Sequence, residues 1–143
     1  MADETPIAIT KEDYEALFGF RYALRRFLRF SEQGARSAGL TPQQHQLLLA
    51  VKGQPEREWA TVSELAEALQ VVHHTAVELV DRCEAAALVR RAPHPTDRRQ
   101  VRVVLTERGE ALLARLSARN LRELKTLRES LSLSFLNAIH LEE

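Results

Sequence analysis

The sequence predicts a mainly α-helical chain with one small β-hairpin. Apolar residues recur at spacings of three and four over most of its 143 residues, which is the pattern of amphipathic helices. The exception is residues 88–105, where two short apolar segments flank a proline-containing loop, as in a hairpin. With 45% hydrophobic and 28% charged residues, the chain has the composition of one soluble globular domain.

Composition excludes several classes of protein. The chain has no run of about 18 uncharged apolar residues, so no segment is expected to span a membrane. The acidic N-terminal segment lacks the basic-then-apolar pattern of a secretory signal. We therefore expect a cytoplasmic protein. The one cysteine, Cys83, cannot form an intrachain disulfide and is too little for a thiolate zinc site.

Two helices are predicted in the N-terminal third. Residues 11–37 carry apolar side chains at helical spacing with arginines between them, and Gly39 ends this segment. Thr41 and Pro42 then form a helix start, with an N-cap followed by proline in the first turn. This second helix is expected to end near Gly53, and a loop to follow it.

Two shorter helices joined by a tight turn come next. Ser63 is predicted to be the N-cap of a helix over 63–69, with Gln70 and Val71 as the turn. A further helix is predicted over 73–87. Placing its residues at intervals of about 100° separates an arc that should pack inward from one that should face outward. The inward arc comprises Ala76, Leu79, Val80, Cys83 and Ala87. The outward arc comprises His74, Glu78, Asp81 and Ala85. Cys83 is thus predicted to be a packed core residue and not a redox sensor.

The C-terminal half begins with the hairpin. Its strands are predicted at 88–91 and 101–105, and a helix resumes at Thr106. A break near 130–132 is predicted to precede a last short helix that holds Phe135, Leu136 and Ile139. The terminal helices carry more apolar surface than one small core can bury. We therefore expect them to pair with each other and with a second copy of the chain.

Charge is balanced in total and uneven in distribution. The 20 basic and 20 acidic residues cancel, which by itself argues against nucleic-acid binding. Residues 90–102, however, contain five arginines against one aspartate, and residues 21–36 contain five arginines against one glutamate. These two local excesses mark basic patches on a neutral protein.

A short helix, a tight turn, a second helix and an arginine-tipped hairpin lie within one contiguous stretch. A second helix held across a first by such a turn can enter the DNA major groove, which is about 12 Å wide. The hairpin beside it can reach phosphates or the minor groove. This order is typical of a winged helix-turn-helix that binds duplex DNA.

The same stretch resembles the MarR family (multiple antibiotic resistance regulators). The resemblance covers roughly residues 14–140. It is carried by Leu40-Thr41-Pro42-Gln43-Gln44, Ser63-Glu64-Leu65-Ala66, Leu69, Thr75-Ala76, Leu79-Val80-Asp81-Arg82, Leu88-Val89-Arg90-Arg91, Asp97-Arg98-Arg99 and Leu105-Thr106-Glu107-Arg108-Gly109. It implies a winged helix-turn-helix over 41–105 and dimerisation helices over 11–37 and 106–143. It further implies a homodimer on an inverted-repeat operator, no cofactor, and often a small ligand or oxidant that releases the DNA.

Two residues depart from the family pattern. Val72 stands where the family commonly has a serine that caps the recognition helix, and the missing cap costs about 1 kcal/mol unless a nearby histidine replaces it. Glu78 stands where a basic or polar residue is frequent. Its carboxylate repels phosphate but can accept a hydrogen bond from a cytosine amino group. The preferred DNA sequence therefore stays open.

Arg98 and Arg99 are the strongest candidates for DNA contact, because arginine is drawn into narrow minor grooves. Asp97 is predicted to support the wing by holding the Arg99 guanidinium. Base contacts are expected from the start of the recognition helix, and Ser63 is a candidate phosphate donor. The recognition-helix candidates are His73, His74, Thr75, Val77 and Glu78.

Other functions are weighed against DNA binding. His73, His74 and Glu78 could suggest a metal site, but two or three ligands on one exposed helix do not define one. No catalytic motif is present, so an enzyme is not expected. A winged-helix module that binds another protein stays open, since zero net charge and Glu78 favour it while the arginine-tipped wing favours DNA. The resemblance places effectors between the dimer helices and the winged domain, where each candidate can equally be a core or interface residue. The candidates are Tyr22, Arg25, His45 and Trp59.

Overall fold

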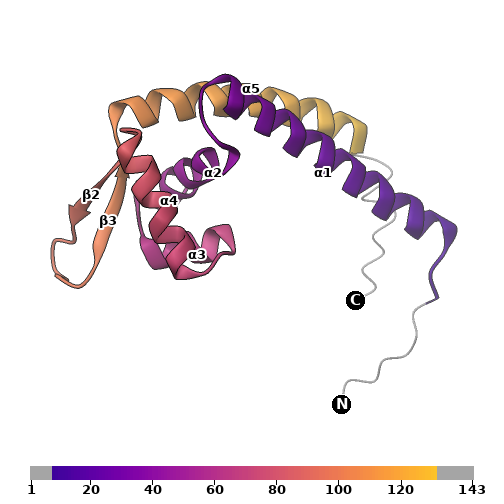
Figure 1. The fold of residues 1–143 in the computed structure, drawn as a ribbon. Helices are drawn as coiled ribbons and strands as arrows, with labels where there is room; N and C mark the ends of the chain where they lie inside the picture. The colour runs from indigo at the N-terminus through magenta and orange to yellow at the C-terminus, as the bar shows by residue number, and fades with distance from the viewer. Residues whose placement is uncertain (1–7, 132–143) are drawn as a thin grey trace, which may run out of the picture. The chain divides into compact units, whose positions relative to one another are not determined.

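The computed structural model describes residues 8–131, which form a mostly helical chain with one small antiparallel sheet (Figure 1). Its elements are α1 (Lys11–Ser37), α2 (Pro42–Lys52), β1 (Trp59–Thr61), α3 (Val62–Leu69), α4 (His73–Ala85), β2 (Val89–Pro93), β3 (Val101–Leu105) and α5 (Glu107–Leu131). The predicted fold class is confirmed. The predicted last helix around Phe135 lies outside the described residues.

The chain divides into two compact units. The terminal unit takes the residues up to Phe30 and those from Asn120 onwards, and the central unit is Ser31–Arg119. The division runs through α1 and α5. The assignment of residues 41–105 to DNA binding and of 11–37 and 106–143 to dimerisation stays a prediction. The central unit contains the whole stretch predicted to be a winged helix-turn-helix.

The sheet has three strands where the sequence predicts two. Its order is β1-β3-β2, and both pairings are antiparallel. β1 was missed because it is only three residues long, too short for an alternating pattern to show. Its middle residue, Ala60, is fully buried and lies opposite Val103 of β3. β1 thereby anchors the hairpin to the segment that leads into α3.

The start of α3 corrects one prediction. The N-cap is Thr61 and not Ser63, which is an exposed residue of the first helical turn. The backbone N–H of Glu64 donates to the Thr61 hydroxyl over 3.2 Å, and the Thr61 N–H donates to the Glu64 carboxylate over 3.0 Å. This reciprocal pair is a capping box, which needs Ser or Thr followed three residues later by Glu or Gln. Thr61 has Glu64 at that spacing, whereas Ser63 has Ala66.

The core of the central unit joins all of its helices to the sheet. Its largest fully buried side chains are Leu47, Leu48, Leu65, Leu88, His45, Val51, Val80, Val89, Val103 and Cys83. Burial raises the pKa of the Cys83 thiol to about 11, so almost no reactive thiolate forms at neutral pH. The prediction that Cys83 is a packed residue is confirmed.

His45 makes the stability of this core depend on pH. Its side chain is only 2% exposed, its Nδ1 has no hydrogen-bond partner, and burial lowers its pKa below the ordinary value of 6.5. Near and below pH 6.5 the unfolded chain binds more protons than the folded one at this position, so stability falls as pH falls. We expect the free energy of unfolding to decrease between pH 7.5 and 5.5, and to decrease less in His45→Leu. Urea denaturation at both pH values measures this, and equal decreases in the two proteins would exclude His45 as the cause.

Candidate nucleic-acid interface

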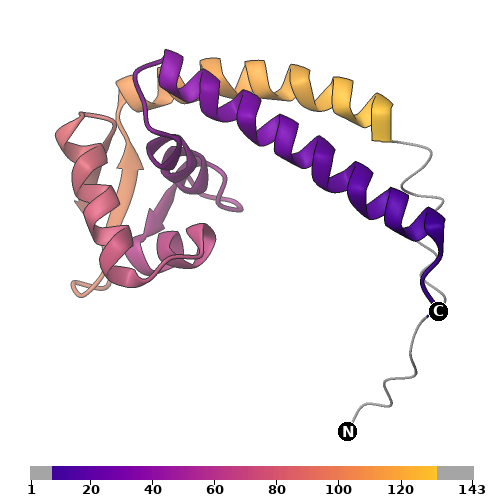
Figure 2. The same ribbon diagram turned by 45° about the vertical axis from the view of Figure 1, so that its right-hand side comes forward.

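A tight turn connects α3 to α4. Gln70 adopts a left-handed conformation with φ 54° and ψ 47°, and its side-chain amide donates to the Glu67 carbonyl over 2.7 Å. The Val71 N–H donates to the Ala66 carbonyl over 3.0 Å, which closes the end of α3. Only three residues therefore separate the two helices. They lie together in the central unit in both ribbon views (Figures 1 and 2), as in a helix-turn-helix.

The outer face of α4 carries the predicted base-reading residues. His73, His74, Thr75 and Glu78 are exposed, and Val77 is half-buried. His74 Nε2 lies 3.1 Å from Glu78 Oε1, so the histidine partly occupies this carboxylate. No side chain caps the start of α4 at Val72, so the predicted missing cap is confirmed and no histidine replaces it.

The inner face of α4 is confirmed at four of its five predicted positions. Ala76, Leu79, Val80 and Cys83 are buried. Ala87 was expected in the same arc, but α4 ends at Ala85 and Ala87 is exposed with a φ of 59°. At this point the Leu88 N–H donates to the Cys83 carbonyl over 2.9 Å, which turns the chain from the helix into β2.

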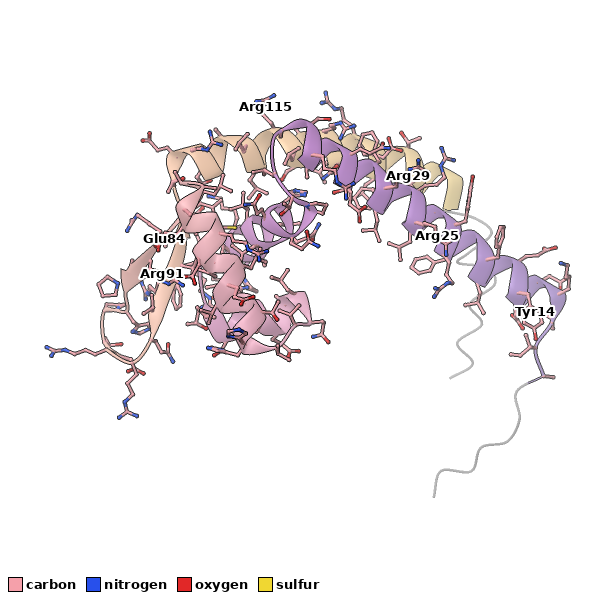
Figure 3. The ribbon with its side chains drawn as sticks, viewed as in Figure 1. Tyr14, Arg25, Arg29, Glu84, Arg91 and Arg115 are labelled. Carbon is pink, nitrogen blue, oxygen red and sulfur yellow. The ribbon has the colours of Figure 1, made fainter. Side chains whose placement is uncertain are left out.

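Arg91 fastens the wing to α4. Its guanidinium lies 2.7 Å from Asp81 Oδ1 and 3.0 Å from Glu84 Oε1, and its backbone N–H donates to Glu84 Oε2 over 3.1 Å. Figure 3 shows Arg91 of β2 beside Glu84 of α4. Two carboxylates therefore neutralise this guanidinium, which fixes β2 against the recognition helix and does not add to the positive charge of the wing.

The tip of the wing presents two arginines. Arg98 and Arg99 are exposed, and neither guanidinium makes an ion pair with any described residue. Asp97 supports the loop in a different way from the one predicted, because its Oδ1 accepts the backbone N–H of Arg99 over 3.0 Å and does not bind the Arg99 guanidinium. The carboxylate shapes the loop backbone and leaves the guanidinium groups available to a ligand.

Trp59 supports the wing from β1. Two guanidinium groups contact its indole ring, with Arg57 4.3 Å and Arg102 3.9 Å from the ring centroid. The His94 ring meets it edge-on, at 5.8 Å between centroids. Arg57 also forms a bidentate ion pair with Glu64, which lowers the pKa of that carboxyl to about 2. Sequence reasoning missed this cluster because β1, which places Trp59 beside the wing, was not predicted.

A cleft of about 560 Å³ lies beside α4. Its lining comes from Glu32, Thr41, Pro42, Gln43, Gln44, Gln46, Leu69, Val71, Thr75, Glu78, Leu79 and Arg82. Thr75 and Glu78 are shared between the cleft and the exposed face of α4. The cleft therefore gives a small molecule access to two of the predicted base-reading residues.

The four predicted effector residues lie elsewhere. His45 is in the core, and Trp59 is in the wing-support cluster. In the terminal unit, Tyr22 stacks on Phe18 with centroids 6.0 Å apart, and Arg25 is exposed. None of the four lines the cleft, and their role in effector binding stays a prediction.

Two further observations concern residues 8–131 alone. Within this range, His, Cys, Asp and Glu side chains do not gather in any group of three or more that could hold a metal ion. Nor does any helix in the described range combine the length and the apolar character needed to cross a membrane.

Comparisons with known proteins agree with this geometry. A model of the MarR family matches residues 38–100, which contain α2, α3, α4 and most of the wing. The HTH-type transcriptional repressor NicR of Pseudomonas putida is 36% identical over 111 residues, which cover 78% of this chain. The chain belongs to the MarR family. The match spans 66% of NicR, slightly less than two thirds of that protein.

Solved structures of MarR proteins share the fold. The MarR family transcription regulator SP03579 is 29% identical with a TM-score of 0.71, and the match covers 89% of this chain and 82% of that protein. Sco3205, a MarR family regulator of Streptomyces coelicolor in complex with DNA, is 22% identical with a TM-score of 0.67. That match covers 87% of this chain and 78% of Sco3205.

Proposed function

We propose that this MarR protein is a sequence-specific transcriptional regulator, acting in the cytoplasm, that binds duplex DNA through α4 and the wing. The observation that carries the proposal is the pair of exposed guanidinium groups at Arg98 and Arg99, which form no ion pair within residues 8–131, on a hairpin that Arg91 fastens to α4. Two features of relatives support it, since NicR is named a transcriptional repressor and Sco3205 is described in complex with DNA. Repression is accordingly the proposed mode of action.

The two parts of the interface have different roles in this proposal. Arg98 and Arg99 bind the minor groove or its phosphates, which supplies affinity that depends on salt. His73, His74, Thr75, Val77 and Glu78 enter the major groove and read base edges. Ser63 and the uncapped N-terminus of α4 supply phosphate contacts through a hydroxyl and free backbone N–H groups.

The active form is proposed to be a homodimer. The terminal unit exposes a series of large apolar side chains that a folded monomer leaves in water. These are Ile9, Tyr14, Leu17, Phe18, Phe20, Tyr22, Leu24, Leu28, Leu121 and Leu124. A second copy covering them would bring two wings to one duplex, and the operator would be an inverted repeat with half-sites about one helical turn apart. Because the chain has no net charge, affinity depends on both copies binding together.

A small molecule is proposed to release the DNA. The cleft beside α4 is partly lined by Thr75 and Glu78, so a compound bound there would change the position of two base-reading residues. Arg82, Leu69 and Leu79 also line it. These groups suit an amphipathic ligand with a polar end.

One titration separates DNA binding from the alternative of a protein-binding winged helix. We expect a labelled duplex of arbitrary sequence to bind at low salt, with the logarithm of the affinity falling linearly as the logarithm of the salt concentration rises. Fluorescence anisotropy at several salt concentrations measures this. Sequencing of DNA fragments selected by the protein then tests for an inverted repeat. A complete lack of binding at low salt would contradict the proposal and favour the protein-binding module.

A further inference from the structure

The histidine that follows β2 shapes the wing loop through its ring. His94 Nδ1 lies 3.2 Å from the backbone nitrogen of Thr96 and 3.0 Å from that of Asp97. Both backbone groups are donors, so accepting from them requires the tautomer that carries its proton on Nε2. The Thr96 hydroxyl oxygen lies 3.3 Å from the same Nδ1. The backbone N–H of His94 donates to the Gln100 carbonyl over 3.3 Å, which closes the loop.

The His94 ring also contacts Trp59. The two rings are nearly perpendicular, at 83°. Trp59 is itself fixed by Arg57 and Arg102, and Arg57 pairs with Glu64, whose carboxylate is part of the cap of α3. A continuous series of contacts therefore connects the first helix of the helix-turn-helix to the wing loop through His94.

His94 is also connected to the arginine at the tip. Its ring accepts the N–H of Asp97, and the Asp97 carboxylate accepts the N–H of Arg99. We propose that His94 is a positioning residue, which holds the loop in the conformation that presents Arg98 and Arg99 to DNA only while its ring is neutral. This inference rests on the proposed function, because it concerns how the wing meets DNA.

Protonation would reverse the role of Nδ1. The imidazolium carries a proton on both nitrogens, so Nδ1 would face two backbone N–H donors as a third donor and both of these hydrogen bonds would break. Of the groups that contact Nδ1, only the Thr96 hydroxyl could accept from it, and it does not hold the Asp97 N–H in place. The charged residues connected to the ring are Asp97 on the loop, whose backbone N–H donates to Nδ1, and Arg57 and Arg102, which contact Trp59. Acidification should therefore loosen the loop, whereas simple attraction between an imidazolium and phosphate would tighten DNA binding.

Anisotropy titrations of three proteins with one duplex, at pH 8 and pH 5.5, distinguish a loosened loop from attraction between the imidazolium and phosphate. His94→Asn keeps an oxygen acceptor that can form the same turn and does not titrate. We expect it to bind like the wild type at pH 8, and His94→Ala to bind roughly tenfold more weakly. At pH 5.5 the wild type should lose affinity relative to His94→Asn.

For each protein, the affinity at pH 5.5 is divided by the affinity at pH 8. Comparing this ratio between the wild type and His94→Asn cancels any effect of acidification on the other histidines. If the wild type and His94→Asn change by the same factor between the two pH values, or if the wild type gains affinity relative to His94→Asn, the ring does not position the wing. Equal binding of His94→Ala and the wild type at pH 8 would overturn the proposal as well.

A measurement without DNA keeps this inference separate from the proposed function. In NMR spectra of the free protein, the amide signals of Thr96 and Asp97 should move with pH at the same midpoint as the His94 ring, and should not do so in His94→Asn. If the Thr96 and Asp97 amide signals did not change with the His94 ring signals, the positioning role would be overturned. If no protein bound duplex at pH 8, the proposed function would fail while this result still decided whether His94 shapes the loop.

Discussion

Replacing both Arg98 and Arg99 with alanine is expected to weaken duplex binding about 10- to 100-fold at low salt. Both guanidinium groups are exposed and unpaired among the described residues, so their removal breaks no internal ion pair. The slope of the logarithm of affinity against the logarithm of salt concentration should become shallower by roughly one for each phosphate that the wing no longer neutralises. Anisotropy titrations over a salt series measure both quantities.

A matched control separates the wing from the reduction of charge alone. Arg108 and Arg115 are exposed on α5, and their double alanine variant changes the net charge by the same amount. We expect this control to keep most of the affinity and the salt slope. Both variants should unfold within about 0.5 kcal/mol of the wild type, as exposed substitutions usually do. A control that loses as much affinity as the wing variant would mean that total charge, and not the wing, binds the DNA.

Helical spacing and cap residues predicted most of the fold. The spacing is informative because each helix turns one side to the core, and this is why the inward arc of α4 emerged at Ala76, Leu79, Val80 and Cys83. The errors lie where local signals compete. Ser63 and Thr61 are both acceptable caps in isolation, and the pairing of Thr61 with Glu64 decides between them.

The candidate site could be predicted only where its residues are adjacent in sequence. Two consecutive arginines in a turn already indicate an exposed basic tip. The pairing of Arg91 with Asp81 and Glu84 depends on how β2 packs against α4, and the Trp59–His94 contact depends on a strand of three residues. Neither arrangement leaves a periodic pattern, so the sequence count of five arginines overstated the charge that the wing offers to DNA.

The second large effect is expected at Gly109, the last residue of the Leu105–Gly109 motif. A Cβ at this position would overlap the carbonyl oxygen of Leu88. That oxygen cannot move away freely, because it accepts the Thr106 N–H over 3.0 Å and belongs to a fully buried residue. Gly109 is therefore required for the first turn of α5 to pack against the corner between α4 and β2.

We expect Gly109→Ala to lower the free energy of unfolding by about 3 kcal/mol, since the backbone of α5 or of the corner must shift. The shift would also strain the Thr106 hydroxyl, which donates to the Ala87 carbonyl over 2.6 Å and accepts the Gly109 N–H over 3.0 Å. Gly19→Ala in α1 is the control, because its Cβ would meet no atom within 4 Å and alanine favours a helix by about 0.5–1 kcal/mol. Urea denaturation of the two variants should move the midpoint in opposite directions. If Gly109→Ala were as stable as the wild type, the backbone around Leu88 would have shifted at little cost. Close packing would then not be the reason that position 109 needs glycine.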